Sequence, residues 1–199
     1  MRQRQVSAFS LVELLISVSL GVVLVSAVSY GITTQVRGTQ DLERSQRTRD
    51  DGTRLNYLIQ TEASEAVNTA TGVTISGCAA SANGKVSLFS LTIPRPTARF
   101  DDLTNVAMIH YYSNTNAGLT DLRRCGPGIQ RNGSLDFATN VDGIVSANTV
   151  LTVVSCNETV SSSREVGYQL QLNDVSGGYS PPCAIARAKA FRVVDPTAP

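Results

Sequence analysis

The chain has 199 residues, of which 42% are hydrophobic and 17% are charged, and its formal net charge is +1. This near-neutral balance argues against a uniformly basic surface for nucleic acid, and the single histidine, His110, excludes a metal site built from several histidines. The length suits one domain, or a small domain with an appendage, but the charges are unevenly spread. Residues 14–36 contain no charged residue, whereas nine of the 18 residues from 37 to 54 are charged.

The first segment joins a short basic end to a long apolar stretch. Arg2 and Arg4 precede residues 9–32, FSLVELLISVSLGVVLVSAVSYGI. A helix of this length reaches about 36 Å, which is enough to cross a bilayer core of about 30 Å. The basic end is expected to stay in the cytoplasm, which places everything after Ile32 outside.

Three interpretations of this segment compete. A secretory signal peptide would use the small residues around Val25-Ser26-Ala27 as its cleavage site, and a signal anchor would keep the helix in the membrane. Neither accounts for Glu13, which lies inside the apolar stretch. A carboxylate in lipid costs about 2.5–3.5 kcal/mol on insertion scales, so an intramembrane acid indicates a function once its partner is named.

The residues around Glu13 resemble a known family. Ala8 followed by FSLVELLISVSLG is similar to the N-terminal signature of type IV pilins and type II secretion pseudopilins. The resemblance implies that a prepilin peptidase removes the leader, residues 1–8, by cutting between Ala8 and Phe9. It also implies methylation of the new Phe9 amine and makes Glu13 the glutamate at the fifth mature position. Most family members have Gly before the cut, where this chain has Ala8.

In such a filament, Glu13 is expected to pair with a neighbouring subunit. In a helical stack, the Glu13 carboxylate of one subunit meets the Phe9 amine of the next, which neutralises two charges that are costly in a dry filament core. The pairing also sets the axial register between subunits. The partners that the resemblance implies are other pilin or pseudopilin subunits, the prepilin peptidase, an inner-membrane assembly platform and the membrane itself.

After the apolar stretch, the helix is expected to continue to about Ala66. We therefore expect a transmembrane or filament-core helix over 9–32, its continuation over 33–68, and a globular β-rich domain over 69–199, an α+β fold. The charged run is interpreted as a solvated helix face. From Leu55 onward a mainly apolar stripe with i, i+3, i+4 spacing predicts where the helix docks on the domain. Its members are Leu55, Leu58, Ile59, Glu62, Ala63 and Ala66.

The remainder of the chain has β-type patterning. The predicted strands are 73–76, 85–93, 106–112, 119–124, 149–155, 165–172 and 185–194. Strand 165–172 is the clearest, because apolar residues alternate with polar ones as in a half-buried antiparallel strand. Turn signals separate the strands at Asn83-Gly84, Gly126-Pro127-Gly128, Asn132-Gly133, Asp142-Gly143, Gly177-Gly178 and Pro181-Pro182.

Four cysteines lie in the β-rich part, at Cys78, Cys125, Cys156 and Cys183. They are widely spaced and form no CxxC pair, unlike the ligands of a zinc site. Their even number, together with the apolar N-terminus, favours disulfides in an oxidising compartment. Three pairings are open and the sequence does not choose among them. Our preference is Cys78–Cys125 with Cys156–Cys183, of which the second closes a loop near the C-terminus as in many type IV pilins.

Residues that would support another chemistry are few. His110 lies in an apolar strand and is interpreted as structural, and no nucleophile, zinc or phosphate-loop motif occurs. Calcium is a minor alternative, with oxygen ligands from Asp101, Asp102, Asp136, Asn140 and Asp142. DNA contact in an uptake pilus would use Arg123, Arg124 and Arg131 near Tyr111 and Tyr112, but solvated strand residues are the favoured interpretation. We expect no enzymatic activity, cofactor or metal.

These observations favour a minor pilin or pseudopilin, held in the inner membrane by one helix with its domain outside and then assembled into a pilus or pseudopilus. A shorter and weaker match, VAMIHYY and GLTDLRR, is similar to PilW-like minor pilins and J-type minor pseudopilins. The alternative is a secreted or membrane-anchored extracytoplasmic β-domain that binds a ligand or a surface.

Overall fold

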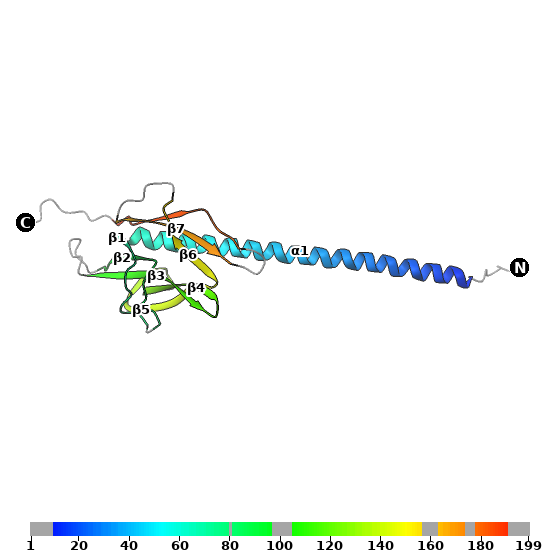
Figure 1. Ribbon diagram of the computed structural model, residues 1–199, viewed down its shortest axis with the longest axis horizontal. Coiled ribbons are helices and arrows are strands. Elements are labelled where there is room, and N and C mark those ends of the chain that lie inside the picture. Colours follow the sequence, from blue (N-terminus) through cyan, green and yellow to red (C-terminus); the bar gives the residue numbers. More distant parts are fainter. Residues whose placement is uncertain (1–9, 80, 97–104, 157–162, 174–177, 191–199) are drawn as a thin grey trace, which may run out of the picture. The chain divides into compact units, whose positions relative to one another are not determined.

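A computed structural model describes residues 10–79, 81–96, 105–156, 163–173 and 178–190. In this part of the chain one long helix, α1 (Leu11–Glu65), is followed by eight strands (Figure 1). The chain divides into two compact units, one up to Ser45 and one from Gln46 onward. The expected α+β class is therefore confirmed.

The described part of the first unit is almost entirely helical. Its residues from Leu11 to Ser45 form an unbroken part of α1, and the large apolar side chains along it are exposed. The segment contains no proline, so nothing in the sequence forces a kink. The expected helix over 9–32 is thus present from Leu11, while Met1–Phe9 lie outside the described residues.

The second unit combines the end of α1 with two antiparallel sheets. The larger sheet has the order β1-β2-β3-β4-β5 and the smaller one the order β6-β7-β8. The strands are β1 (Asn68–Thr71), β2 (Phe89–Pro94), β3 (Val106–Asn116), β4 (Leu119–Ile129), β5 (Leu135–Ser146), β6 (Thr149–Val153), β7 (Glu165–Leu172) and β8 (Ala184–Arg187).

The helix and both sheets share one core. Every member of the predicted stripe is buried, Glu62 included, except Leu58, which is half-buried. Phe89 of β2 stacks on Tyr111 of β3 at 4.9 Å between ring centroids and lies 6.0 Å from Tyr168 of β7, which joins the two sheets. The expectation that the helix docks from Leu55 onward is confirmed.

Gly52 extends this contact surface toward the start of the unit. It is buried, and a Cβ atom at this position would lie 3.3 Å from both Leu172 Cδ1 and Tyr179 Cε1. A glycine here therefore lets the helix approach the smaller sheet closely, although it weakens the helix by about 1 kcal/mol relative to alanine.

The strand predictions are partly correct. β7 has the predicted bounds, 165–172, and its alternating residues Val166, Tyr168, Leu170 and Leu172 are all buried. β3 and β4 begin where predicted but extend to Asn116 and Ile129, and β2 and β6 overlap their predictions. The 185–194 prediction matches only the three residues 185–187 of β8, and residues 191–194 lie outside the described part.

Other strand and turn predictions are wrong. Segment 73–76 makes only an isolated bridge, Thr74 to Val86, and the first strand is instead β1 at 68–71, which begins within the segment expected to be helical to 68. β5 was not predicted, because the expected turn at Asp142-Gly143 lies inside it. The expected turn at 126–128 lies inside β4, beside a register shift between Pro127 and Gly128. At this point residues 137–139 of β5 have no partner in β4, so the ladder is interrupted while β4 itself continues.

Candidate functional site

The exposed half of α1 is the first candidate site. It is long and apolar enough to cross a membrane, and none of its most apolar window is buried within the chain. A contiguous apolar surface of this size is not stable in water and indicates contact with lipid or with another protein. The exposed large side chains from Leu11 to Ile32 are Leu11, Val12, Leu14, Leu15, Ile16, Val18, Leu20, Val22, Val23, Leu24, Val25, Val28, Tyr30 and Ile32.

Glu13 lies in the first turn of this helix and is exposed. It is the only charged residue of α1 before Arg37. Its backbone N–H donates to the Ser10 carbonyl at 3.0 Å, and its own carbonyl accepts from Ser17 Oγ at 2.7 Å. The carboxylate therefore stands at the start of an otherwise uncharged surface, where the positive end of the helix dipole favours an anion. The junction of Ala8 and Phe9 lies outside the described residues.

Several hydroxyl groups of this helix half are satisfied within the helix. Ser17, Ser26 and Thr34 donate to the carbonyls four residues earlier at 2.7–2.8 Å, and Ser19 donates to the carbonyl of Ile16 at 2.9 Å. Such internal bonds remove the cost of placing a hydroxyl in an apolar environment. A Cβ atom added at Gly21 would have nothing within 4 Å of it, so this face is open to a closely packed neighbour.

The buried half of α1 carries a different acid, Glu62, which anchors the helix to the larger sheet. Its carboxylate accepts from Arg124 Nε of β4 at 2.7 Å and from the Tyr111 hydroxyl of β3 at 2.5 Å. Arg124 Nη1 also donates to the Pro127 carbonyl at 2.8 Å. Burial raises the pKa of Glu62, although the Arg124 charge and the Tyr111 hydrogen bond oppose that rise. Sequence reasoning placed Glu62 in the stripe but did not identify its partners.

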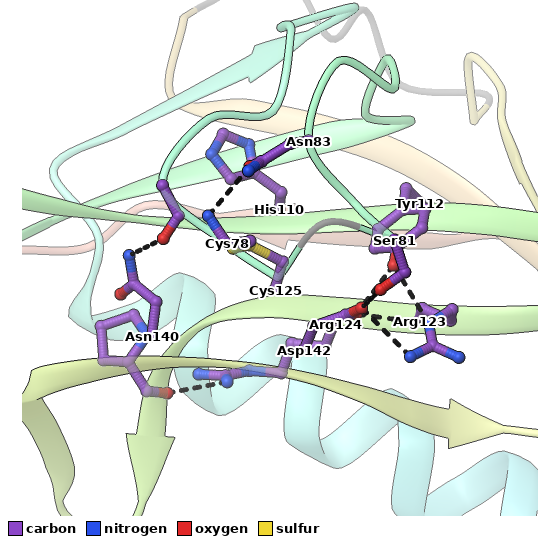
Figure 2. Close-up of a disulfide and its surroundings, with 12 residues drawn as sticks. Cys78, Ser81, Asn83, His110, Tyr112, Arg123, Arg124, Cys125, Asn140 and Asp142 are labelled. Atoms are coloured by element: carbon purple, nitrogen blue, oxygen red, sulfur yellow. Dashed lines mark hydrogen bonds and ion pairs between the residues drawn. A yellow bond between two sulfur atoms is a disulfide. The ribbon is translucent and has the colours of Figure 1, made fainter.

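The outer face of the larger sheet is covered by the segment that precedes β2. The disulfide Cys78–Cys125 joins this segment to β4, and Ile75 and Ala82 pack with Tyr112 in a small second core (Figure 2). The Cys78 N–H donates to Asn83 Oδ1 at 3.1 Å, which holds the turn beside the disulfide. The disulfide thus links two residues that lie 47 positions apart in the sequence, across one face of the sheet.

Asp142 of β5 fastens the same segment by its side chain. Its carboxylate accepts from Ser81 Oγ at 2.5 Å, from the Tyr112 hydroxyl at 2.7 Å and from Arg123 Nη2 at 3.1 Å (Figure 2). Burial opposes ionisation of Asp142, but these hydrogen bonds outweigh it and hold the pKa of the carboxyl below its usual value. Asn140 adds a bond from its Nδ2 to the Gly77 carbonyl at 3.0 Å.

The second disulfide, Cys156–Cys183, joins the segment after β6 to the segment before β8. The four candidate cysteines therefore form the two preferred pairs, and no free cysteine is present. Two disulfides in one β-domain are typical of an oxidising, extracytoplasmic compartment.

The only histidine of the chain, His110, lies in a buried hydrogen-bonded group. His110 is buried, its Nδ1 lies 2.7 Å from Ser90 Oγ, and Ser90 Oγ in turn lies 2.8 Å from Ser87 Oγ. Burial lowers the pKa of His110. All three residues are at most 3% exposed, so this chain of hydroxyls and imidazole has no open path to a substrate.

The proposed oxygen ligands and the proposed nucleic-acid contacts do not form sites in the described residues. Asp142 is occupied by Arg123, and Asp136 Oδ1 accepts from the Ala138 N–H at 3.0 Å. No group of three acidic, cysteine or histidine residues is placed to hold a metal ion within the described part of the chain. Asp101 and Asp102 lie outside it. Arg124, Tyr111 and Tyr112 are buried, so the favoured interpretation of them as solvated strand residues is wrong, and these three side chains are not exposed for contact with DNA.

Comparison of the chain with protein-family models, with curated proteins and with solved structures gives no match.

Proposed function

We propose that the chain is a non-enzymatic subunit of a type IV pilus or of a type II secretion-like pseudopilus, in the class of minor pilins and pseudopilins. The observation that carries this proposal is the exposed apolar half of α1 with Glu13 alone in its first turn. Other support comes from the disulfide-bonded β-domain, which suits an extracytoplasmic location.

In this proposal the subunit occupies two environments in turn, first the inner membrane and then a filament. In the inner membrane, the apolar side chains of α1 contact lipid, the N-terminus stays cytoplasmic and the domain lies outside. After a prepilin peptidase cuts between Ala8 and Phe9 and the Phe9 amine is methylated, an assembly platform moves the subunit into a filament. There the same side chains contact the helices of neighbouring subunits, so the apolar surface of α1 is shielded from water both in the membrane and in the filament.

Glu13 is the residue that distinguishes a filament subunit from a simple anchor. In lipid its carboxylate costs about 2.5–3.5 kcal/mol on insertion scales, a cost that a membrane anchor has no reason to carry. In the filament the Phe9 amine of an adjacent subunit neutralises it and fixes the axial offset between the two. Removal of the charge is therefore expected to leave insertion intact and to impair incorporation.

The mature N-terminus tests the proposal directly. Mass spectrometry of the chain purified from its membrane is expected to find a chain that begins with N-methyl-Phe9. A chain that begins after Ala27 would overturn the proposal and favour a secreted domain that binds a ligand or a surface. An intact leader in cells with an active prepilin peptidase would leave the chain as a membrane anchor, which also contradicts the proposal.

A matched pair of variants tests the role of Glu13. Glu13→Gln keeps the size of the side chain and removes its charge, while Ser29→Ala changes an exposed residue of the same helix. Both are expected to fractionate with the membrane, but only Glu13→Gln should be depleted from sheared filaments, by about tenfold or more. Equal incorporation of the two variants would contradict the assigned role.

A further inference from the structure

The outer edge of β5 is an open strand edge. β5 pairs with β4 and forms the last strand of the larger sheet, at the rim of the β-domain (Figure 1). At the opposite edge, the Thr69 N–H of β1 already donates to the Ser163 carbonyl at 2.7 Å. Among the described residues, no backbone hydrogen bond outside the β4 pairing reaches β5 between residues 140 and 144. An unpaired edge offers main-chain donors and acceptors that only another extended segment satisfies.

The open edge has a defined length. The β4–β5 register is continuous from Asn140 to Ile144, and it shifts on either side, before Asn140 and after Ile144. These register shifts interrupt the ladder and limit regular pairing to about five residues. A short peptide fits this edge, whereas the long flat edges that promote aggregation are absent from this strand.

The two faces of β5 are used differently. Asn140 and Asp142 bond to the disulfide-linked segment on the outer face of the sheet (Figure 2). Because side chains alternate along a strand, Val141 and Gly143 lie on the opposite face. Val141 remains 49% exposed there. The strand is thus held firmly by one face while the other face and the edge remain accessible.

A cavity of about 580 Å³ adjoins this accessible face. Its apolar lining includes Leu58 of α1, Ile129 of β4 and Val141 and Val145 of β5. Its volume lies within the range of about 300–1,000 Å³ that is typical of ligand sites. An aliphatic side chain of a peptide lying along β5 would enter it, which adds side-chain selection to main-chain pairing.

The charges at the cavity favour a basic peptide. Arg124 lines the cavity, but its charge is already paired with Glu62. The carboxylate of Asp136, also in the lining, accepts the Ala138 N–H and has no ion pair with a described residue. The uncompensated charge is therefore negative, and a lysine or arginine next to the aliphatic residue complements it.

We propose that the edge of β5 from Asn140 to Ile144 and the adjoining cavity bind an extended segment of a partner protein. The segment pairs with the strand edge, places an aliphatic side chain among Leu58, Ile129 and Val141, and presents a basic residue to Asp136. This site lies wholly in the second unit and does not depend on the proposed filament function.

A library of random nine-residue peptides tests this site on the detergent-solubilised full chain. Selected peptides are expected to contain an aliphatic residue close to a lysine or arginine. Their binding should fall at least tenfold for Val141→Lys, which puts a charge at the edge and cavity. It should be unchanged for Val86→Lys, a matched exposed valine at 61% exposure outside this site.

Two further measurements make the outcome decisive. In the complex, amide NMR shifts should be confined to residues 140–144 and the cavity lining, and Asp136→Asn should remove the preference for basic over acidic peptides. The proposal is overturned if no peptide is selected, or if binding is insensitive to Val141→Lys. It is equally overturned if β5 of one copy pairs with β5 of another. The sign of that pairing is a dimer that forms in the absence of peptide and that Val141→Lys dissociates.

Discussion

The two ends of helix α1 are opposite in composition and in burial. The end from Leu11 to Val36 is almost wholly uncharged, yet its side chains are exposed; Leu20, for example, is 59% exposed. The end from Gln46 to Glu65 is rich in polar residues, yet Ile59 in its stripe is fully buried. Burial within the chain thus follows the available partner surface rather than hydrophobicity, and the apolar end requires a partner that the chain does not itself provide.

The two acids of the helix make the same contrast. Glu62 is enclosed by the Arg124 guanidinium and the Tyr111 hydroxyl, whereas Glu13 is exposed on an apolar surface. A carboxylate that is buried in a protein or placed in lipid is energetically unfavourable unless a cation or a hydrogen-bond donor contacts it. For Glu62 the chain itself supplies that group, and for Glu13 we propose that a second subunit does.

The largest effect is expected from removing the acid of the docked end. Glu62→Ala leaves the buried Arg124 guanidinium without its carboxylate and should lower the free energy of unfolding of the second unit by about 3–5 kcal/mol. Urea unfolding of the detergent-solubilised chain, followed by tyrosine near-UV circular dichroism, measures this change. The exposed neighbour is the control, since Glu65→Ala should leave the transition in place. Similar shifts for both variants would show that the ion pair does not hold the helix.

Truncating an apolar side chain at each end tests the contrast in burial. Ile59→Ala removes buried contacts with the core and should destabilise the second unit by about 2–5 kcal/mol. Leu20→Ala removes as large a side chain from an exposed position of the first unit, and the same unfolding transition should not move. A shift with Leu20→Ala would mean that the apolar end contributes to the stability of the domain.

Removing a disulfide should affect only the second unit. Cys78→Ser with Cys125→Ser, or Cys156→Ser with Cys183→Ser, is expected to lower its stability by about 2–4 kcal/mol. The first pair should have the larger effect, because it closes 47 residues against 27. Far-UV circular dichroism in detergent should retain the signal of the apolar helix in both variants. Loss of that helix on reduction would contradict the division into two units.

The smallest effect is a pH dependence that also belongs to the second unit. Burial lowers the pKa of His110 below 6.5, so the unfolded chain binds this proton more readily than the folded one. Stability is therefore expected to fall as the pH drops below about 6.5, until the folded-state pKa is passed. Unfolding midpoints between pH 7.5 and 5.5 measure the slope, and His110→Gln should reduce it. The raised pKa of Glu62 has the opposite effect, because above pH 4.5 it makes stability fall as the pH rises. Glu62 is present in both the parent chain and the His110→Gln variant, so its contribution cancels in the comparison.

Local patterns explain which elements were predictable. The bounds of β7 were predicted correctly because its apolar residues Val166, Tyr168, Leu170 and Leu172 alternate with other residues without interruption. The docking stripe from Leu55 was predicted correctly because its apolar residues recur with the period of a helix. β5 was missed because LDFATNVDGIVS lacks alternation and contains Asp142-Gly143, which elsewhere signals a turn. Its strand form depends on pairing with β4, and on the Asp142 bonds to Ser81 and Tyr112, which no local pattern reveals.

The sequence by itself determined the helix with its uncharged end, the position of Glu13, the docking stripe and the β character of the remainder, since each depends on the order of nearby residues. Only the tertiary structure decided that Glu62 meets Arg124 and Tyr111, that Cys78 joins Cys125, and that the β5 edge lies open beside a cavity. Those features join residues tens of positions apart. Their contacts depend on strand order and register, which are properties of the whole packed domain.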